Sequence, residues 1–168
     1  MRVVLYMAST ANGFIAKKNH ETPWSDGEWE AFSSFVDSAG NIIIGRRTYE
    51  IMLNGNEFEK LGNPFVVVVS KSLSIGGSGF VVADSPEQAL KIIEKKGLPT
   101  AVVAGGSMLN SSFMKLGLVD EIIIDVEPFV FGSGIKMFPG ADFESKLELI
   151  EFKRLPGSTI QLHYRVLK

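Results

Sequence analysis

The chain has 168 residues, 45% of them hydrophobic, and a formal net charge of −2. This length predicts one domain, residues 1–168, with a sizeable core, and the acidic balance argues against a nucleic-acid partner. There is no cysteine, which excludes disulfides and cysteine nucleophiles, and two histidines do not predict a metal centre.

The apolar N-terminal run lacks the charged leader and the cleavage site of a signal peptide. No apolar run approaches the roughly 20 residues that span a bilayer. We therefore expect no membrane partner and a cytoplasmic protein.

The predicted elements alternate between strands and helices along most of the chain. Apolar runs predict strands at 2–9, 41–45, 65–69, 80–82, 101–104 and 119–126, and helical spacing predicts helices at 26–39, 46–53, 86–97 and 107–116. Ser25 with Glu28, and Ser85 with Gln88, fit capping boxes at two helix starts. A glycine-rich turn includes Gly76 and Gly77.

The C-terminal part contains no predicted helix. Residues 127–140 are predicted to be a loop, and 147–155 with 159–167 predict an antiparallel hairpin that turns at Pro156 and Gly157. The fold class is therefore α/β with three layers: a mostly parallel central sheet flanked by helices, with an antiparallel C-terminal hairpin. In such a sheet, ligands bind at the carboxyl ends of the strands.

Three strand ends carry groups that can bind phosphate. Gly45–Thr48 and Gly105–Leu109 each place a glycine-containing turn before a helix, where free N–H groups and the helix dipole favour anions. Ser70–Ser72 adds hydroxyls and the Lys71 ammonium. Together, these strand ends offer sites for two separate phosphate groups. They predict a ligand with a pyrophosphate and a further ribose phosphate, of which NADPH is the commonest. The alternative is that the charged residues are ordinary solvated loop residues. The glycine fingerprint of the Rossmann fold is absent.

Four motifs in this order resemble those of the dihydrofolate reductase superfamily. They are Ser9–Ala16, Ile44–Glu50, Val103–Ser107, and Leu118–Glu121 leading to Pro128–Gly134. The chain is most similar to stand-alone relatives of the pyrimidine reductase domain of riboflavin biosynthesis, the RibD C-terminal domain.

The resemblance implies an NADP-dependent oxidoreductase and the roles of individual residues. Arg46, Arg47, Thr48, Ser70 and Lys71 would hold phosphates. Gly105, Gly106, Ser107, Met108 and Leu109 would cradle the pyrophosphate across a cis Gly105–Gly106 peptide, next to Gly45. Ala8, Asn12 and Ile15 would flank the nicotinamide.

The proton donor is not fixed by the resemblance. Dihydrofolate reductases carry an acid on the first helix after a tryptophan, and Glu28 follows Trp24 with a spacing one residue short. Glu28 also has a structural role in its capping box, which we regard as the stronger interpretation. Asp125 is the second candidate, because alternation along its strand can turn it toward the same cavity; the alternative is a solvent-exposed strand end.

The substrate is predicted only by class. The pyrimidine reductase pattern has an aspartate at Asn12 and a basic residue at Phe14, and these departures argue against assuming its phosphorylated substrate. With Ser9, Trp24 and Tyr49 as substrate contacts, we expect a small planar heterocycle, pteridine- or pyrimidine-like. A non-catalytic nucleotide-binding protein and a flavin oxidoreductase remain alternatives. Apolar edges in the C-terminal hairpin and in the preceding loop predict a homodimer.

Overall fold

The computed structural model describes residues 1–72, 79–140 and 142–168, so the predicted turn at Gly76 and Gly77 lies outside the described residues. The helices are α1 (Asp26–Ala39), α2 (Arg46–Asn54), α3 (Glu57–Lys60), α4 (Pro86–Lys95) and α5 (Ser107–Lys115). The strands are β1 (Arg2–Thr10), β2 (Phe14–Ala16), β3 (Asn41–Gly45), β4 (Phe65–Val69), β5 (Phe80–Ala83), β6 (Thr100–Val103), β7 (Glu121–Glu127), β8 (Ile135–Lys136), β9 (Lys146–Arg154) and β10 (Ile160–Leu167).

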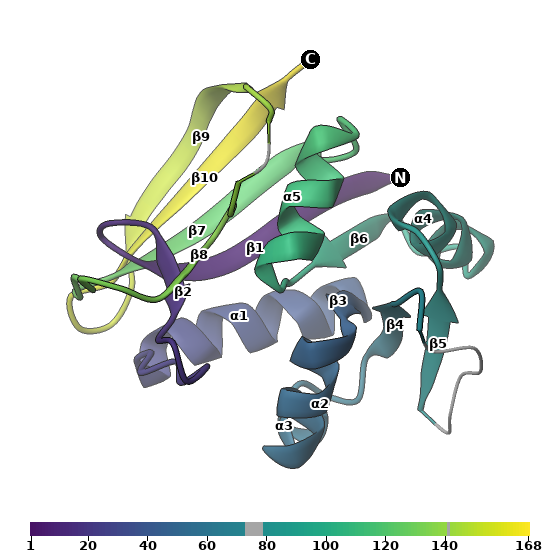
Figure 1. Ribbon diagram of the computed structural model, residues 1–168, viewed down its shortest axis with the longest axis horizontal. Coiled ribbons are helices and arrows are strands. Elements are labelled where there is room, and N and C mark those ends of the chain that lie inside the picture. Colours follow the sequence, from purple (N-terminus) through teal and green to yellow (C-terminus); the bar gives the residue numbers. More distant parts are fainter. Residues whose placement is uncertain (73–78, 141) are drawn as a thin grey trace.

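Among the described residues, eight strands form one sheet in the order β5-β4-β3-β6-β1-β7-β10-β9. The strands from β5 to β7 are parallel to one another, and β10 and β9 continue the sheet in antiparallel pairing. Figure 1 shows the β9–β10 hairpin at one end of the sheet and β5 at the other. The predicted fold class is confirmed.

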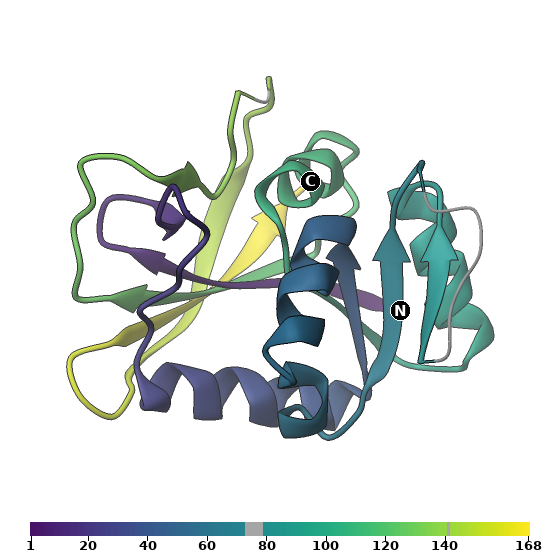
Figure 2. The same ribbon diagram turned by 60° about the horizontal axis from the view of Figure 1, so that its bottom comes forward.

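Helices cover the sheet on opposite faces because successive residues of a strand point to opposite sides. On one face, Val3 and Leu5 of β1 belong to a buried cluster that includes Phe113 of α5 and Ile93 of α4. On the other face, Tyr6 of β1 packs in a cluster with residues of α1. Figure 2 shows α1 along the face of the sheet away from α5. This arrangement gives the predicted three layers.

The helix starts follow the predicted chemistry only in part. Ser25 caps α1 by accepting a hydrogen bond from the Glu28 N–H at 3.2 Å, and Ser85 caps α4 in the same way through the Gln88 N–H at 3.3 Å. Among the described residues, no hydrogen bond joins the Ser25 N–H to the Glu28 carboxyl. The predicted capping-box role of the Glu28 side chain is therefore wrong, and this side chain is free for another role.

The sequence predicted a loop at residues 127–140, but the structure places a short strand within this range. This strand, β8, pairs with β2 in a separate two-stranded ladder, which a stretch rich in proline, glycine and phenylalanine did not indicate. Asn12 bonds to the Phe131 backbone next to this ladder, with its Nδ2 donating to the carbonyl at 2.8 Å and its Oδ1 accepting from the N–H at 3.2 Å. The Asn12–Gly13 turn is thus tied to the loop after β7. In the described ranges, no helix is long and apolar enough to cross a membrane.

Candidate active site

The N-termini of α2 and α5 lie next to each other at the carboxyl ends of β3 and β6. Each helix begins after a glycine, Gly45 or Gly106, and neither start has a side-chain cap. The Gly45 N–H donates to the Gly105 carbonyl at 2.8 Å, which joins the two strand ends. The Gly105–Gly106 peptide is cis, as the resemblance implied. The uncapped N–H groups of both first turns are therefore available to an anion.

The two turns lie close together at these glycines. A Cβ atom on Gly45 would lie 3.7 Å from the Gly106 nitrogen, and one on Gly106 would lie 3.2 Å from Thr48 Oγ1. The bare backbone leaves room for a phosphate between the helix starts.

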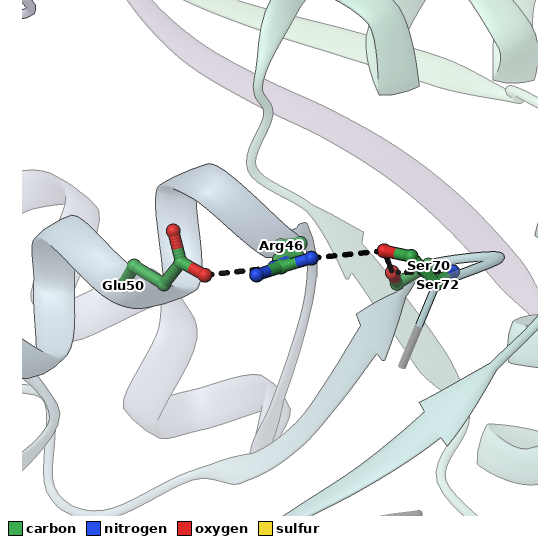
Figure 3. Close-up of polar contacts among 4 residues, drawn as sticks. All are labelled: Arg46, Glu50, Ser70 and Ser72. Atoms are coloured by element: carbon green, nitrogen blue, oxygen red, sulfur yellow. Dashed lines mark hydrogen bonds and ion pairs between the residues drawn. The ribbon is translucent and has the colours of Figure 1, made fainter. Parts of the chain in front are cut away.

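A polar cluster adjoins this point at the end of β4. Arg46 Nη1 donates to Ser72 Oγ at 3.0 Å, its Nε donates to Glu50 Oε1 at 2.8 Å, and Ser70 Oγ lies 3.2 Å from Ser72 Oγ. Figure 3 shows the guanidinium between the carboxylate of α2 and the two serines. The guanidinium is about half exposed and is oriented on both sides, so it forms a prearranged site for a phosphate group.

A single cleft of about 1510 Å³ connects this cluster with the first turn of α1. Most predicted site residues line it: Ala8, Ile15, Trp24, Glu28, Gly45, Arg46, Arg47, Thr48, Ser70, Lys71, Gly106, Ser107, Met108 and Leu109. The cleft is large enough for a dinucleotide together with a small substrate.

Other predicted site residues do not line the cleft. Tyr49 packs on the far side of α2, with ring centroids 4.5 Å from Phe80 and 5.5 Å from Phe58, so the predicted stacking on substrate is wrong for this residue. Ser9 is buried in β1, and the Gly105 carbonyl is occupied by Gly45. The Asn12 side chain holds the Phe131 backbone rather than facing the cleft.

Glu28 lies at the opposite end of the cleft from the phosphate-binding groups. It is 4% exposed, and the described residues provide no hydrogen bond to its carboxyl group. Burial, followed by the charges of Asp125 and Glu127, raises its pKa to about 8. At neutral pH, the Glu28 carboxyl therefore carries a proton and faces the cleft.

The sequence predicted that Asp125 faces the cleft or, as the alternative, lies at a solvent-exposed strand end. The structure corrects both positions. Asp125 is fully buried in β7 and accepts hydrogen bonds of 2.8 Å from the Tyr6 hydroxyl and from Gln161 Nε2. Burial raises its pKa to about 6, although these two hydrogen bonds act in the opposite direction. Burial and the adjacent Asp125 raise the pKa of Tyr6, which stays protonated and lines the cleft.

The sequence analysis missed Tyr6, Gln161 and Glu127 of this buried network. Period-two alternation in β7 places Asp125 and Glu127 on one face of the sheet, and this was the available signal. Tyr6 and Gln161 could not be found in this way, because their proximity depends on the sheet order.

Trp24 closes the cleft near Glu28. Its ring stacks on Phe131, with centroids 6.3 Å apart and an interplanar angle of 11°. Lys18 and His20 line the cleft in the same region. This end thus combines an aromatic side chain with a protonated acid, whereas the α2–α5 end presents uncapped backbone N–H groups.

Sheet order, the Gly-Gly turn and the position of the cleft define a dihydrofolate reductase-like fold. Residues 1–160 match the family model described as RibD C-terminal domain, and the chain belongs to this family. The family reduces a pyrimidine in riboflavin biosynthesis.

Individual relatives agree with this membership. The chain is 32% identical over 170 residues to the uncharacterized protein YwjB of Bacillus subtilis (strain 168), covering 97% of each. A crystal structure described as a putative riboflavin biosynthesis protein from Shewanella sp. PV-4 matches all of both chains with a TM-score of 0.78 and 19% identity. The deaminase/5-amino-6-(5-phosphoribosylamino)uracil reductase of Thermotoga maritima matches with a TM-score of 0.77 and 19% identity, over 99% of this chain and 56% of that one.

Proposed function

We propose that this protein is an NADPH-dependent reductase that transfers a hydride to a small planar heterocycle. The observation that carries the proposal is one cleft with uncapped helix N-termini at one end and a buried, protonated acid at the other. A dinucleotide with an extra phosphate fits the first end, and a substrate that must gain a proton fits the second.

The residues present fit NADPH at the first end. The free N–H groups of α2 and α5, separated only by glycine backbone, would hold the pyrophosphate. Arg46, Ser70, Lys71 and Ser72 would hold the ribose phosphate, since a guanidinium and hydroxyls provide several donors to one dianion. When bound, NADPH supplies the hydride.

Glu28 would supply the proton. Addition of a hydride to a C=N or C=O bond leaves negative charge on nitrogen or oxygen, and a neutral carboxyl within reach donates a proton to that atom. Burial raises the pKa of Glu28 most, and the charge of Asp125, which is hydrogen-bonded to Tyr6, raises it further. Ala8 and Ile15 line the cleft between the two ends and would exclude water from the reacting atoms.

The substrate class follows from the wall of the cleft. Trp24 lines the cleft and its ring is stacked on Phe131, so it offers an aromatic surface that suits a pyrimidine or a pteridine ring. Membership of a family that reduces a pyrimidine supports the same class.

Two measurements test the proposal in sequence. Calorimetry with NADPH and NADH tests binding, and NADPH absorbance is then followed with 5-amino-6-(5-phosphoribosylamino)uracil, dihydrofolate and related heterocycles. We expect NADPH to bind more tightly than NADH and to be oxidised with at least one of these substrates. Absence of NADPH binding refutes the proposal, and tight binding without turnover on the panel favours a non-catalytic nucleotide-binding protein.

A further inference from the structure

Glu127, at the end of β7, is a buried carboxylate held by hydroxyl groups. It is 1% exposed, and its Oε1 accepts hydrogen bonds from Ser25 Oγ at 2.7 Å and from Thr159 Oγ1 at 2.9 Å. None of the ion pairs among the described residues includes it. A buried charge without a cation is costly, so its position requires these hydroxyls and the nearby start of α1.

The Ser25 hydroxyl links Glu127 to Glu28. Because this hydroxyl donates its hydrogen to Glu127, its lone pairs are available to the Glu28 N–H, from which it accepts at 3.2 Å. The orientation of the N-cap, and with it the first turn of α1, is therefore fixed by a carboxylate on a different element.

The turn between β9 and β10 also contacts the first turn of α1. Thr159 follows this turn, and its hydroxyl lies 3.2 Å from that of Ser25. A Cβ atom on Gly27 would lie 3.0 Å from the Pro156 carbonyl oxygen, so the backbone of α1 is in close contact with the turn. The first turn of α1 is thus held between β7 and the C-terminal hairpin.

We propose that Glu127, together with Thr159, is a positioning residue for Glu28: both hold the Ser25 hydroxyl at the first turn of α1, so that the Glu28 carboxyl faces the cleft. This inference rests on the proposed function, because Glu28 has a proton to deliver only if the protein is a reductase.

The charged groups around Glu28 come from several elements. Asp125 and Glu127 face it from β7, the Tyr6 hydroxyl faces it from β1, and Lys153 of β9 acts on Asp125. Burial has the largest effect on the pKa of Glu28, and the two β7 carboxylates raise it further. Removal of the Glu127 charge should therefore lower the pKa of Glu28.

The first experiment measures the titration of the Glu28 carboxyl in the absence of substrate. In protein labelled with ¹³C at the glutamate carboxyls, Glu28→Gln identifies the Glu28 signal, and its titration is followed in Glu127→Gln. We expect the midpoint to fall by about one pH unit, as for the removal of one nearby like charge. Glu30→Gln, which removes an exposed charge from the same helix, should leave the midpoint unchanged.

The second experiment uses the Glu28 amide signal to detect a shift of the first turn of α1. Thr159→Val deletes one hydrogen bond to Glu127 at nearly constant volume, and Thr159→Ser restores it. The Glu28 amide signal should shift in the first variant and return in the second. With an active substrate, kcat should fall about 10-fold in Thr159→Val, with an unchanged KM for NADPH and with recovery in Thr159→Ser.

A merely structural role gives a different result. If both Glu127→Gln and Thr159→Val lower the melting temperature but leave the Glu28 titration and amide signal unchanged, the positioning role is refuted. Thr159→Val gives a reading even if Glu127→Gln fails to fold. The spectroscopic measurements need no turnover, so loss of the proposed function and loss of this inference are distinguishable.

Discussion

Glu28 is a buried acid whose protonation is coupled to folding. Its pKa rises from 4.5 to about 8 on folding, so the folded state takes up a proton between these pH values. Stability contributed by this group is present at low pH and is lost as pH rises through this window. Burial is the largest cause of the raised pKa, because the Glu28 side chain lies buried in the first turn of α1.

We predict that Glu28→Gln stabilises the protein at pH 8.5 by the order of a few kcal/mol and has almost no effect near pH 4.5. The amide stays neutral at every pH and avoids the cost of burying a charge. Thermal unfolding of both proteins at the two pH values measures the difference, with Glu30→Gln as the exposed control. An equal effect at both pH values would contradict the raised pKa.

The same residue should control the pH dependence of activity. Because Glu28 donates only when protonated, kcat should decline as pH rises through about 8 and should be lowered at least 100-fold in Glu28→Gln. A pH–rate profile with the active substrate measures both effects. A flat profile in the wild-type protein would assign the proton to another group.

Arg46 is the residue that should distinguish NADPH from NADH. Arg46→Ala removes the guanidinium that Glu50 and Ser72 hold in place, and we expect affinity for NADPH to fall about 10- to 100-fold, with little change for NADH. Calorimetry with both nucleotides measures this, and Lys91→Ala on the exposed surface of α4 is the control. An equal loss for both nucleotides would place the extra phosphate elsewhere.

At the scale of elements, the junction of α2 and α5 should bind the pyrophosphate through bare backbone. Gly45 has an ordinary φ of −77°, so Gly45→Ala fits the fold but places a methyl group 3.7 Å from the Gly106 nitrogen. We expect a stability change of about 1 kcal/mol or less and at least a 10-fold loss of NADPH affinity.

Gly132→Ala is the matched control for this test, since a Cβ there meets nothing within 4 Å. Thermal unfolding and calorimetry on both variants separate folding from binding. Unchanged NADPH affinity in a folded Gly45→Ala protein would show that no ligand lies between these helix starts.

The elements were predictable from the sequence to the extent that their signals are local. Apolar runs in β1, β3 and β4, and the caps at Ser25 and Ser85, depend on neighbouring residues. The glycine turns and helix starts after β3 and β6 were predictable for the same reason, because a strand, a glycine and a helix start follow one another in the chain; anion binding there stays a prediction.

The acidic end was only partly predictable, because it is assembled from distant segments. Glu28 could be selected as a candidate, but its position depends on contacts of the first turn of α1 with Glu127 and Thr159, which lie more than 90 residues away in the chain and contact the Ser25 hydroxyl. The position of Asp125 beneath Tyr6 depends on the pairing of β1 with β7. Such pairings are fixed by tertiary packing and leave no local signal.

At the scale of the whole molecule, the C-terminal hairpin has an exposed apolar face. Leu149 and Phe152 of β9 and Ile160 of β10 are 50%, 68% and 46% exposed and share the face on which α5 lies. Exposed apolar groups of this kind on a sheet are typical of an interaction surface. We therefore predict that a homodimer forms through this face.

We expect the wild-type protein to be a dimer in light scattering coupled to size exclusion, and Phe152→Glu to shift it toward the monomer. A charge at the centre of this face opposes burial of the two surfaces against each other. Leu53→Glu, at an exposed apolar residue of α2 away from the hairpin, is the control. A wild-type monomer at all concentrations would contradict the prediction.

The hydrogen bond between the Gly45 N–H and the Gly105 carbonyl has one more consequence. It ties the starts of α2 and α5 to adjacent strands of the central sheet, so their spacing is as rigid as the sheet itself. We therefore expect the cleft to select ligands by length. A ligand should bind with full affinity only if the spacing of its charged groups matches the distance between the helix starts of α2 and α5 and the polar cluster of Arg46, Ser70 and Ser72. Adenosine 2′,5′-bisphosphate or nicotinamide mononucleotide, each spanning one part of this distance, should bind far more weakly than the joined molecule, because the linkage between them makes the second contact intramolecular.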